Sequence, residues 1–334
     1  MSRNILMKTI FFPSHFGRDT LNSFFKDLEE NLNTPEILVD CTTLNFSYPS
    51  GMLVAGSKIR KWIKYRREND LVTRKKGYDS IKNVHGYLRH LGFFDFIGMG
   101  EGNEVGEALG SVTYLPITKI EKPIVDLQTQ NVQEWYDEII SQTRRFANLL
   151  SGTHEYTEEN KLYHYALREI VRNVFEHSST DECYLCGQRW ADGRVEVAVI
   201  DEGVGISSSL KRSFEIESEI EALKMAIKPG VSSTTQIAES DNVYGNSGFG
   251  LYVLEQLVSS FGWFMLGSGN AKIVSQGKVL NEQHLNFDGT YIGLRLNRAP
   301  SQFSGILDDI IAEGERAAEV SGIKATASGM SKLS

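Results

Sequence analysis

Two kinds of hydrophobic pattern alternate in the first half of the chain. Residues 34–46 are apolar at nearly successive positions, which predicts a buried strand, and residues 52–67 then have helical spacing. Residues 19–31 also have helical spacing, with Asp19 as the expected N-cap. Strands and helices that alternate in this way predict an α/β layer.

Longer patterns follow in the second half. Residues 132–150 and 157–177 have helical spacing, and valines alternate along residues 195–200 as in a strand. A last amphipathic helix is expected at residues 302–318, and the small and polar residues after it are expected to fray.

A domain junction is expected near residue 120. Residues 98–111 are rich in glycine and glutamate, and an extended stretch that ends at a proline follows them. The chain has 334 residues, of which 41% are hydrophobic, and this length suggests about two domains. The expected parts are an α/β domain in residues 1–120, a second α/β domain in residues 121–300, and a helix with a flexible tail in residues 301–334.

Composition excludes several classes of protein. The chain has 30 glycines and 7 prolines, which is ordinary and rules out collagen-like and mostly disordered chains. No window approaches the ~20 apolar residues of a membrane span, and the first residues lack a signal-peptide cleavage site. The 3 cysteines are too few for a disulfide framework and fit a reducing compartment, so a cytoplasmic protein is expected.

Charge is distributed unevenly around the net value of −8. Residues 1–120 contain 16 Lys and Arg against 13 Asp and Glu, a balance of +3, which leaves −11 for the remainder. Much of the positive charge lies in residues 58–76, with Trp62 and Tyr65 interleaved. This basic segment could bind nucleic acid or an acidic protein surface, and the alternative is a solvated helix face whose apolar side packs inward.

The helix expected at residues 157–177 carries candidate chemistry. Glu169, Asn173 and His177 follow one another at intervals of four and lie on one row, at the border of the apolar stripe. Polar groups at the edge of a core need partners, and a bound metal and phosphate group would supply them. An exposed helix flank with a local hydrogen bond would explain the same row.

Three further stretches carry glycines beside polar residues. Asp201 ends the expected strand and is followed by Gly203 and Gly205, so its carboxylate could accept an exocyclic N–H where the backbone allows close approach. Gly245, Gly248 and Gly250 then open a helix whose N-terminal N–H groups could bind phosphates. Their spacing matches neither the P-loop nor the dinucleotide fingerprint. Finally, Gly289 and Thr290 begin a strand, where the hydroxyl could bond the edge of a ring.

Together these motifs resemble the GHKL (Bergerat-fold) ATPase superfamily over residues 130–298, most closely anti-sigma serine kinases and histidine-kinase-like ATPase domains. All four motifs occur in the order that the family requires. The resemblance implies an α/β sandwich, a mixed sheet covered by helices on one face, that binds ATP and Mg²⁺.

The resemblance also implies roles for individual residues. Glu169 would orient or deprotonate the attacking hydroxyl or water, Asn173 would hold Mg²⁺ against the three phosphates, and His177 would lie on the phosphate side. Asp201 would read adenine. The remaining contacts to ATP would come from Gly203, Gly205, Gly245, Gly248, Phe249, Gly250, Leu251 and Thr290.

Residues 36–67 are similar to the strand, turn and helix of the STAS fold of anti-sigma antagonists, a likeness that extends over about residues 1–115. That family has Asp-Ser-Ser-Gly before the helix, and this chain has Tyr48, Pro49, Ser50 and Gly51, with Pro49 at the position of the phosphorylated serine. The likeness implies a STAS-like partner domain that does not accept phosphate. The alternative is an unrelated α/β domain.

The expected function is therefore that of a Mg-ATP-binding regulatory protein of the anti-sigma-factor or serine-kinase type. It would control a protein partner, either a regulator or a phosphorylation substrate, and a homodimer is compatible with this reading. The alternatives are a nucleotide-gated binding switch without turnover and a nucleic-acid-associated ATPase. A two-component histidine kinase is disfavoured, because neither His154 nor His164 lies in a His-Glu sequence on a heptad helix.

Overall fold

The computed structural model describes residues 7–107, 112–124, 132–233, 247–323, 325–329 and 332. The chain divides into two compact units. The N-terminal unit comprises residues 1–111 with 116–118, and the C-terminal unit comprises residues 112–115 with 119–334. Among the described residues, no helix has the length and apolar character needed to cross a bilayer.

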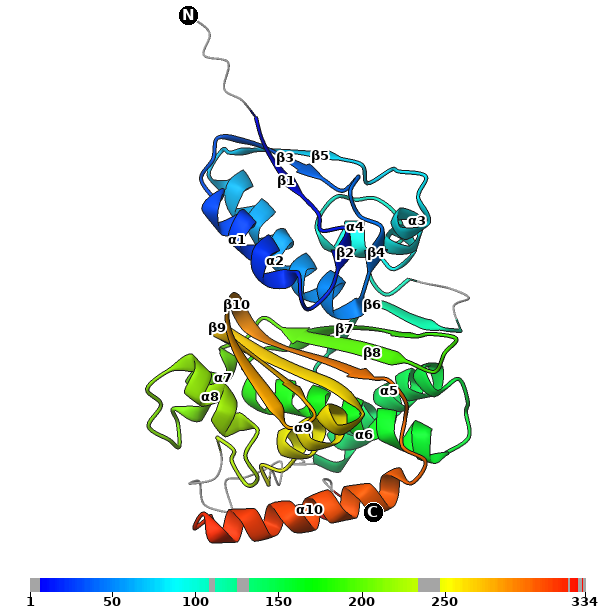
Figure 1. The fold of residues 1–334 in the computed structure, drawn as a ribbon, viewed down its shortest axis with the longest axis vertical. Helices are drawn as coiled ribbons and strands as arrows, with labels where there is room; N and C mark the ends of the chain where they lie inside the picture. Colours follow the sequence, from blue (N-terminus) through cyan, green and yellow to red (C-terminus); the bar gives the residue numbers. More distant parts are fainter. Residues whose placement is uncertain are drawn as a thin grey trace, which may run out of the picture. The chain divides into compact units, whose positions relative to one another are not determined.

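The N-terminal unit is built on a parallel sheet in the order β1-β3-β5 (Figure 1). Its strands are β1 (Lys8–Phe11), β3 (Glu36–Asp40) and β5 (Val72–Lys76), and a short parallel pair joins β2 (His15–Phe16) to β4 (Phe46–Ser47). Its helices are α1 (Leu21–Glu30), α2 (Pro49–Glu68), α3 (Asn83–His90) and α4 (Phe93–Phe96). Strands and helices therefore alternate from β1 to β5, as the hydrophobic pattern predicted.

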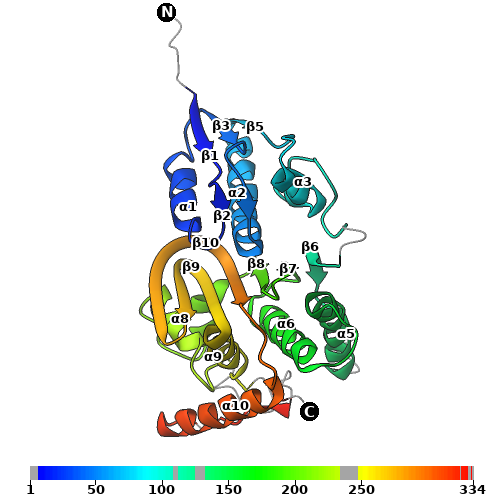
Figure 2. The same cartoon turned by 45° about the vertical axis from the view of Figure 1, so that its right-hand side comes forward.

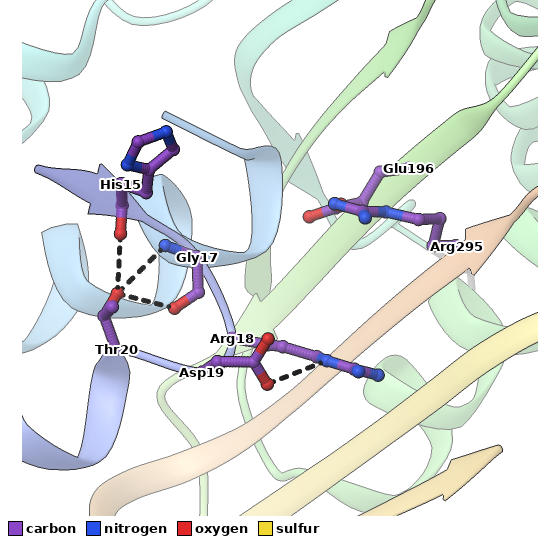
Figure 3. A network of polar contacts seen from close by, with 7 residues as sticks. All are labelled: His15, Gly17, Arg18, Asp19, Thr20, Glu196 and Arg295. Carbon is purple, nitrogen blue, oxygen red and sulfur yellow. Dashed lines mark hydrogen bonds and ion pairs between the residues drawn. The ribbon is translucent and has the colours of Figure 1, made fainter. Parts of the chain in front are cut away.

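Thr20 occupies the N-cap position of helix α1 without a side-chain capping hydrogen bond, and the prediction that Asp19 is the N-cap was wrong. The Thr20 hydroxyl donates to the carbonyl oxygens of His15 and Gly17, both at 3.0 Å, and so fixes the turn before the helix (Figure 3). Asp19 is engaged elsewhere, because its carboxylate lies 3.0 Å from Arg18 Nε.

Helix α2 starts at Pro49, three residues before the predicted start. Proline at the first helical position costs no hydrogen bond, because that N–H has no partner within a helix. Gly51 is required for a close approach, since a Cβ there would lie 2.4 Å from the carbonyl oxygen of Phe16. The start of α2 is therefore packed directly against the end of β2.

Several cations of the basic segment are engaged within the N-terminal unit. Arg66 is fully buried, and its guanidinium donates to the carbonyl oxygens of Thr34 and Val72 at 2.7 Å. Lys58 Nζ lies 2.9 Å from a Glu29 carboxylate oxygen, and Lys76 Nζ lies 3.3 Å from Asp40. Part of the positive charge is thus compensated by neighbouring groups of the same unit.

The second sheet has five strands in the order β6-β7-β8-β10-β9 and belongs to the C-terminal unit except for residues 116–118 of β6. The strands are β6 (Tyr114–Glu121), β7 (Glu182–Arg189), β8 (Val195–Asp201), β9 (Gly262–Gln276) and β10 (Val279–Leu296), and the pairings of β7 with β8, β8 with β10, and β10 with β9 are antiparallel. Glu196 and Arg295 are directly opposite each other on β8 and β10, and Arg295 Nε donates to Glu196 at 2.8 Å (Figure 3).

Helices α5 (Val132–Ser151), α6 (Glu158–His177) and α9 (Gly250–Phe261) lie along one face of this sheet (Figure 2). The unit also contains α7 (Gly205–Leu210), α8 (Glu219–Ala226) and α10 (Phe303–Val320). The predicted apolar stripe of α6 is buried at every position, namely Leu162, Tyr163, Ala166, Leu167, Ile170, Val171 and Val174. It packs with the inward-facing valines of β8 in one core, so the chain as a whole is mixed α/β.

Replacing Arg66 by methionine should destabilise the N-terminal unit by about 3 to 5 kcal/mol, because several buried carbonyl oxygens would lose their donors. Hydrogen exchange of α1 and α2, measured in the full chain, provides the readout. Arg67→Met is the matched control, since Arg67 is exposed on the same helix. Equal exchange in the two variants would contradict the assigned role of Arg66.

Candidate functional site

One pocket in the C-terminal unit brings together residues from α6, β8, α7, β9, β10 and the start of α9. Nine of the predicted site residues line it, namely Glu169, Asn173, His177, Asp201, Gly205, Gly248, Gly250, Leu251 and Thr290. Gly203 and Phe249 lie close in sequence to lining residues but do not line the pocket themselves. Gly245 lies outside the residues that the structure describes.

Glu169 is more deeply buried than its place at the border of the stripe predicted, with 3% of the residue exposed. Its Oε1 atom lies 3.3 Å from Arg168 Nη2 and 3.4 Å from Arg172 Nη1. Its Oε2 atom faces Gly250, where a Cβ would approach to 2.6 Å. A buried carboxylate requires such compensation, and the two arginines hold Oε1 so that Oε2 is directed towards the first turn of α9.

Asn173 has an unmet hydrogen-bonding group at the pocket. Its Nδ2 atom is buried and has no hydrogen-bond partner among the described residues. The two ends of a carboxamide are exchanged by a 180° flip, so the side chain suits a ligand that offers an acceptor to the N–H group or a cation to the carbonyl oxygen. The described residues hold no group of three or more His, Cys, Asp or Glu suited to a metal.

His177 Nδ1 lies 3.0 Å from the hydroxyl of Ser233, and Ser213 donates to the carbonyl oxygen of Ser233 at 2.6 Å. Burial, together with the positive charges of Arg172 and Arg212, lowers the pKa of His177 to about 4. The imidazole is therefore neutral at pH 7. Ser233 was missed in the sequence because it is 56 residues from His177 and belongs to no motif.

Asp201 and Thr290 face each other across the pairing of β8 with β10. Asp201 Oδ1 accepts a hydrogen bond from the N–H of Gly203 at 2.9 Å. Position 289, next to Thr290 on β10, requires a glycine. Gly289 has a φ of +112°, and a Cβ there would lie 2.1 Å from the carbonyl oxygen of Asp201. Strand register thus places a carboxylate and a hydroxyl side by side at one end of the pocket.

Ser268 on β9 joins two glycine turns of the site. Its buried hydroxyl accepts from the N–H of Ile206 at 3.0 Å and donates to the carbonyl oxygen of Gly289 at 2.8 Å. Gly205, with a φ of +79°, leaves room for this hydroxyl, since a Cβ would lie 2.6 Å from it. Ser268 could not be identified from the sequence, because a single serine within a strand gives no signal of a long-range bond.

Gly203 and Phe249, the two described site predictions that do not line the pocket, contribute to packing around it. A Cβ at Gly203 would lie 2.1 Å from the carbonyl oxygen of Ser178, so Gly203 allows the β8 turn to contact the end of α6. Phe249 is completely buried and belongs to the core. Both support the pocket from behind rather than forming its surface.

No protein-family model, curated protein sequence or solved structure matches this chain. The interpretation of the pocket therefore depends on its own geometry and on the motifs of the sequence.

Stability should fall as the pH is lowered from about 6.5 to 4, in part through His177. Its pKa is lower in the folded state than the ordinary value, so the unfolded chain binds a proton that the folded chain does not, at up to about 1.4 kcal/mol per pH unit. Urea unfolding of His177→Gln across this range should show a smaller loss of stability than the unsubstituted protein. An unchanged pH dependence would contradict the neutral imidazole.

Proposed function

We propose that the C-terminal unit binds Mg-ATP in this pocket and that the protein is a regulator of the anti-sigma-factor or serine-kinase type. It would control a protein partner by nucleotide-dependent binding or by phosphorylation. The observation that carries the proposal is that residues from four separate stretches, around Asn173, Asp201, Gly248 and Thr290, line a single pocket. This convergence is what the resemblance to GHKL ATPases requires.

The end of the pocket near Asp201 has the chemistry to recognise adenine. Asp201 and Thr290 lie opposite each other on β8 and β10. The apolar side chains of Val199, Leu210 and Ile292 also line the pocket. Apolar side chains suit the faces of a purine, and a carboxylate suits its exocyclic amino group. Guanine presents a carbonyl oxygen at that position, which a carboxylate would repel.

The other end has the chemistry to hold phosphates. Among the described residues Asn173 Nδ2 has no hydrogen-bond partner, and the first two residues of the twelve-residue helix α9, Gly250 and Leu251, line the pocket. Asn173 would be the protein ligand of Mg²⁺, which favours few protein ligands and several phosphate oxygens. When bound, the ion would supply neutralisation of the phosphate charge.

Glu169 supports turnover in addition to binding. Its Oε1 atom is held by Arg168 and Arg172, while its Oε2 atom faces the start of α9. A carboxylate fixed in this way can accept the proton of an attacking hydroxyl or water. A nucleotide-gated switch without turnover remains the competing reading, and it requires no such residue.

The N-terminal unit is proposed to be a STAS-like partner domain of this ATPase. The supporting observation is its three-stranded parallel sheet with α1 and α2, in which Ser50 and Gly51 lie in the first turn of α2. A nucleic-acid-binding role is not favoured, since Lys58, Arg66 and Lys76 of the basic segment are engaged within the unit.

Asn173→Ala should abolish Mg-ATP binding measured by isothermal titration calorimetry, because it removes the amide proposed as the metal ligand. Glu169→Gln is the matched variant on the same helix row and should retain nucleotide binding while losing turnover of labelled ATP. Undiminished affinity in Asn173→Ala would refute the proposed site. Turnover in Glu169→Gln at the unsubstituted rate would refute the role of the carboxylate alone.

Asp201→Asn should reduce the preference for ATP over GTP by about 10-fold or more, because a carboxamide can donate to the guanine carbonyl that a carboxylate repels. Competition between the two nucleotides for the folded protein provides the measurement. Thr290→Val is the companion variant and should weaken ATP binding without favouring GTP. A preference that is unchanged in Asp201→Asn would show that this carboxylate does not read the base.

A further inference from the structure

The C-terminal segment, which comprises α10 with residues 321–323 and 325–327, packs against residues next to the pocket lining. Helix α10 packs on α9 and α6 through its buried residues, which include Phe303, Leu307 and Ile311. Gly314 is the point of closest approach, because a Cβ there would lie 2.5 Å from the ring of Tyr252 and 3.1 Å from the ring of Phe249. The helix therefore contacts the first turn of α9, which opens at Gly250.

The residues after α10 contact Gly230, which immediately precedes the lining residue Val231. The chain turns back at Gly322, and a Cβ at Gly230 would lie 2.9 Å from Ala325 Cβ and 3.1 Å from Ile323 Cγ2. The N–H of Ala327 donates to Glu315 on α10 at 3.0 Å, which ties the returning residues to the helix. The C-terminal segment thus contacts residues next to the pocket lining at two separate places, around Phe249 and at Gly230.

These two places are linked to each other next to the pocket. The N–H of Gly230 donates to the carbonyl oxygen of Gly248 at 3.1 Å, and a Cβ at Gly248 would lie 2.7 Å from the backbone of Val231. Val231, Gly248 and Gly250 all line the pocket. Among the described residues, Gly230 thus connects Ile323 and Ala325 of the C-terminal segment to the lining residues Val231 and Gly248, and close-packed contacts of this kind transmit displacements.

We infer that the C-terminal segment is a positioning element of the pocket, in which Gly314, Ile323 and Ala325 set the position of three glycines in or next to the pocket lining, namely Gly230, Gly248 and Gly250. This inference rests on the proposed function. Binding of nucleotide and packing of the segment are then coupled, and such coupling is reciprocal: nucleotide tightens the segment, and displacement of the segment weakens nucleotide binding. A protein that captured the C-terminal segment would thereby lower the affinity for ATP.

Two glycines of α10 provide a matched test. Gly314→Ala inserts a methyl group between α10 and the rings of Phe249 and Tyr252, whereas a Cβ at Gly305 meets nothing within 4 Å. Mg-ATP affinity, measured by calorimetry well below the melting temperature, should fall by about 5- to 10-fold in Gly314→Ala and remain unchanged in Gly305→Ala. A lower melting temperature with unchanged affinity would indicate a role in stability only and would overturn the inference.

A truncation pair tests the second contact independently of α10. A chain that ends at Ser321 loses Ile323 and Ala325, and a chain that ends at Ser328 keeps both. The first should bind Mg-ATP more weakly by a similar factor, and the second should match the full chain. This comparison also decides the question if Gly314→Ala does not fold.

Hydrogen exchange of the unsubstituted chain separates failure of the inference from failure of the proposed function. Addition of Mg-ATP should slow exchange in residues 311–327 as well as around the pocket. If the chain binds no Mg-ATP in calorimetry, the proposed function and the inference both fail. If it binds Mg-ATP while exchange in residues 311–327 and the affinities of both variant pairs are unaffected, the proposed function stands and the inference is overturned.

Discussion

The burial of one face of α6 against β8 fixes the rest of the candidate site. Packing of Ile170 and Val174 with the valines of the strand sets the rotation of the helix about its axis. At that rotation Glu169, Asn173 and His177 are directed to the pocket. The same packing buries Glu169, whose carboxylate oxygen Oε1 lies near the guanidinium groups of Arg168 and Arg172.

Local sequence was sufficient where local forces determine the outcome. The apolar stripe of α6 and the strand that ends at Asp201 follow from side-chain periodicity, and the structure confirms both. Periodicity also indicated that Glu169, Asn173 and His177 share one helix row. It could not give the burial of Glu169, because that burial depends on the packing of α6 against other elements such as the start of α9.

Contacts between distant segments explain what the sequence did not reveal. Ser233 meets His177 and Ser268 meets Ile206 only after the sheet and helices are assembled. Asp19 and Thr20 are adjacent candidates for the N-cap of α1, and the prediction selected the wrong one. Asp19 is the stronger N-cap by type, yet its carboxylate pairs with Arg18, and Thr20 forms the turn.

The environment of Glu169 makes its two carboxylate oxygens chemically different. Oε1 lies beside two guanidinium groups, and Oε2 lies beside the start of α9. The two arginines therefore fix the direction of the carboxylate as well as supplying positive charge. Loss of either guanidinium would remove one of the two contacts that hold Oε1 in place.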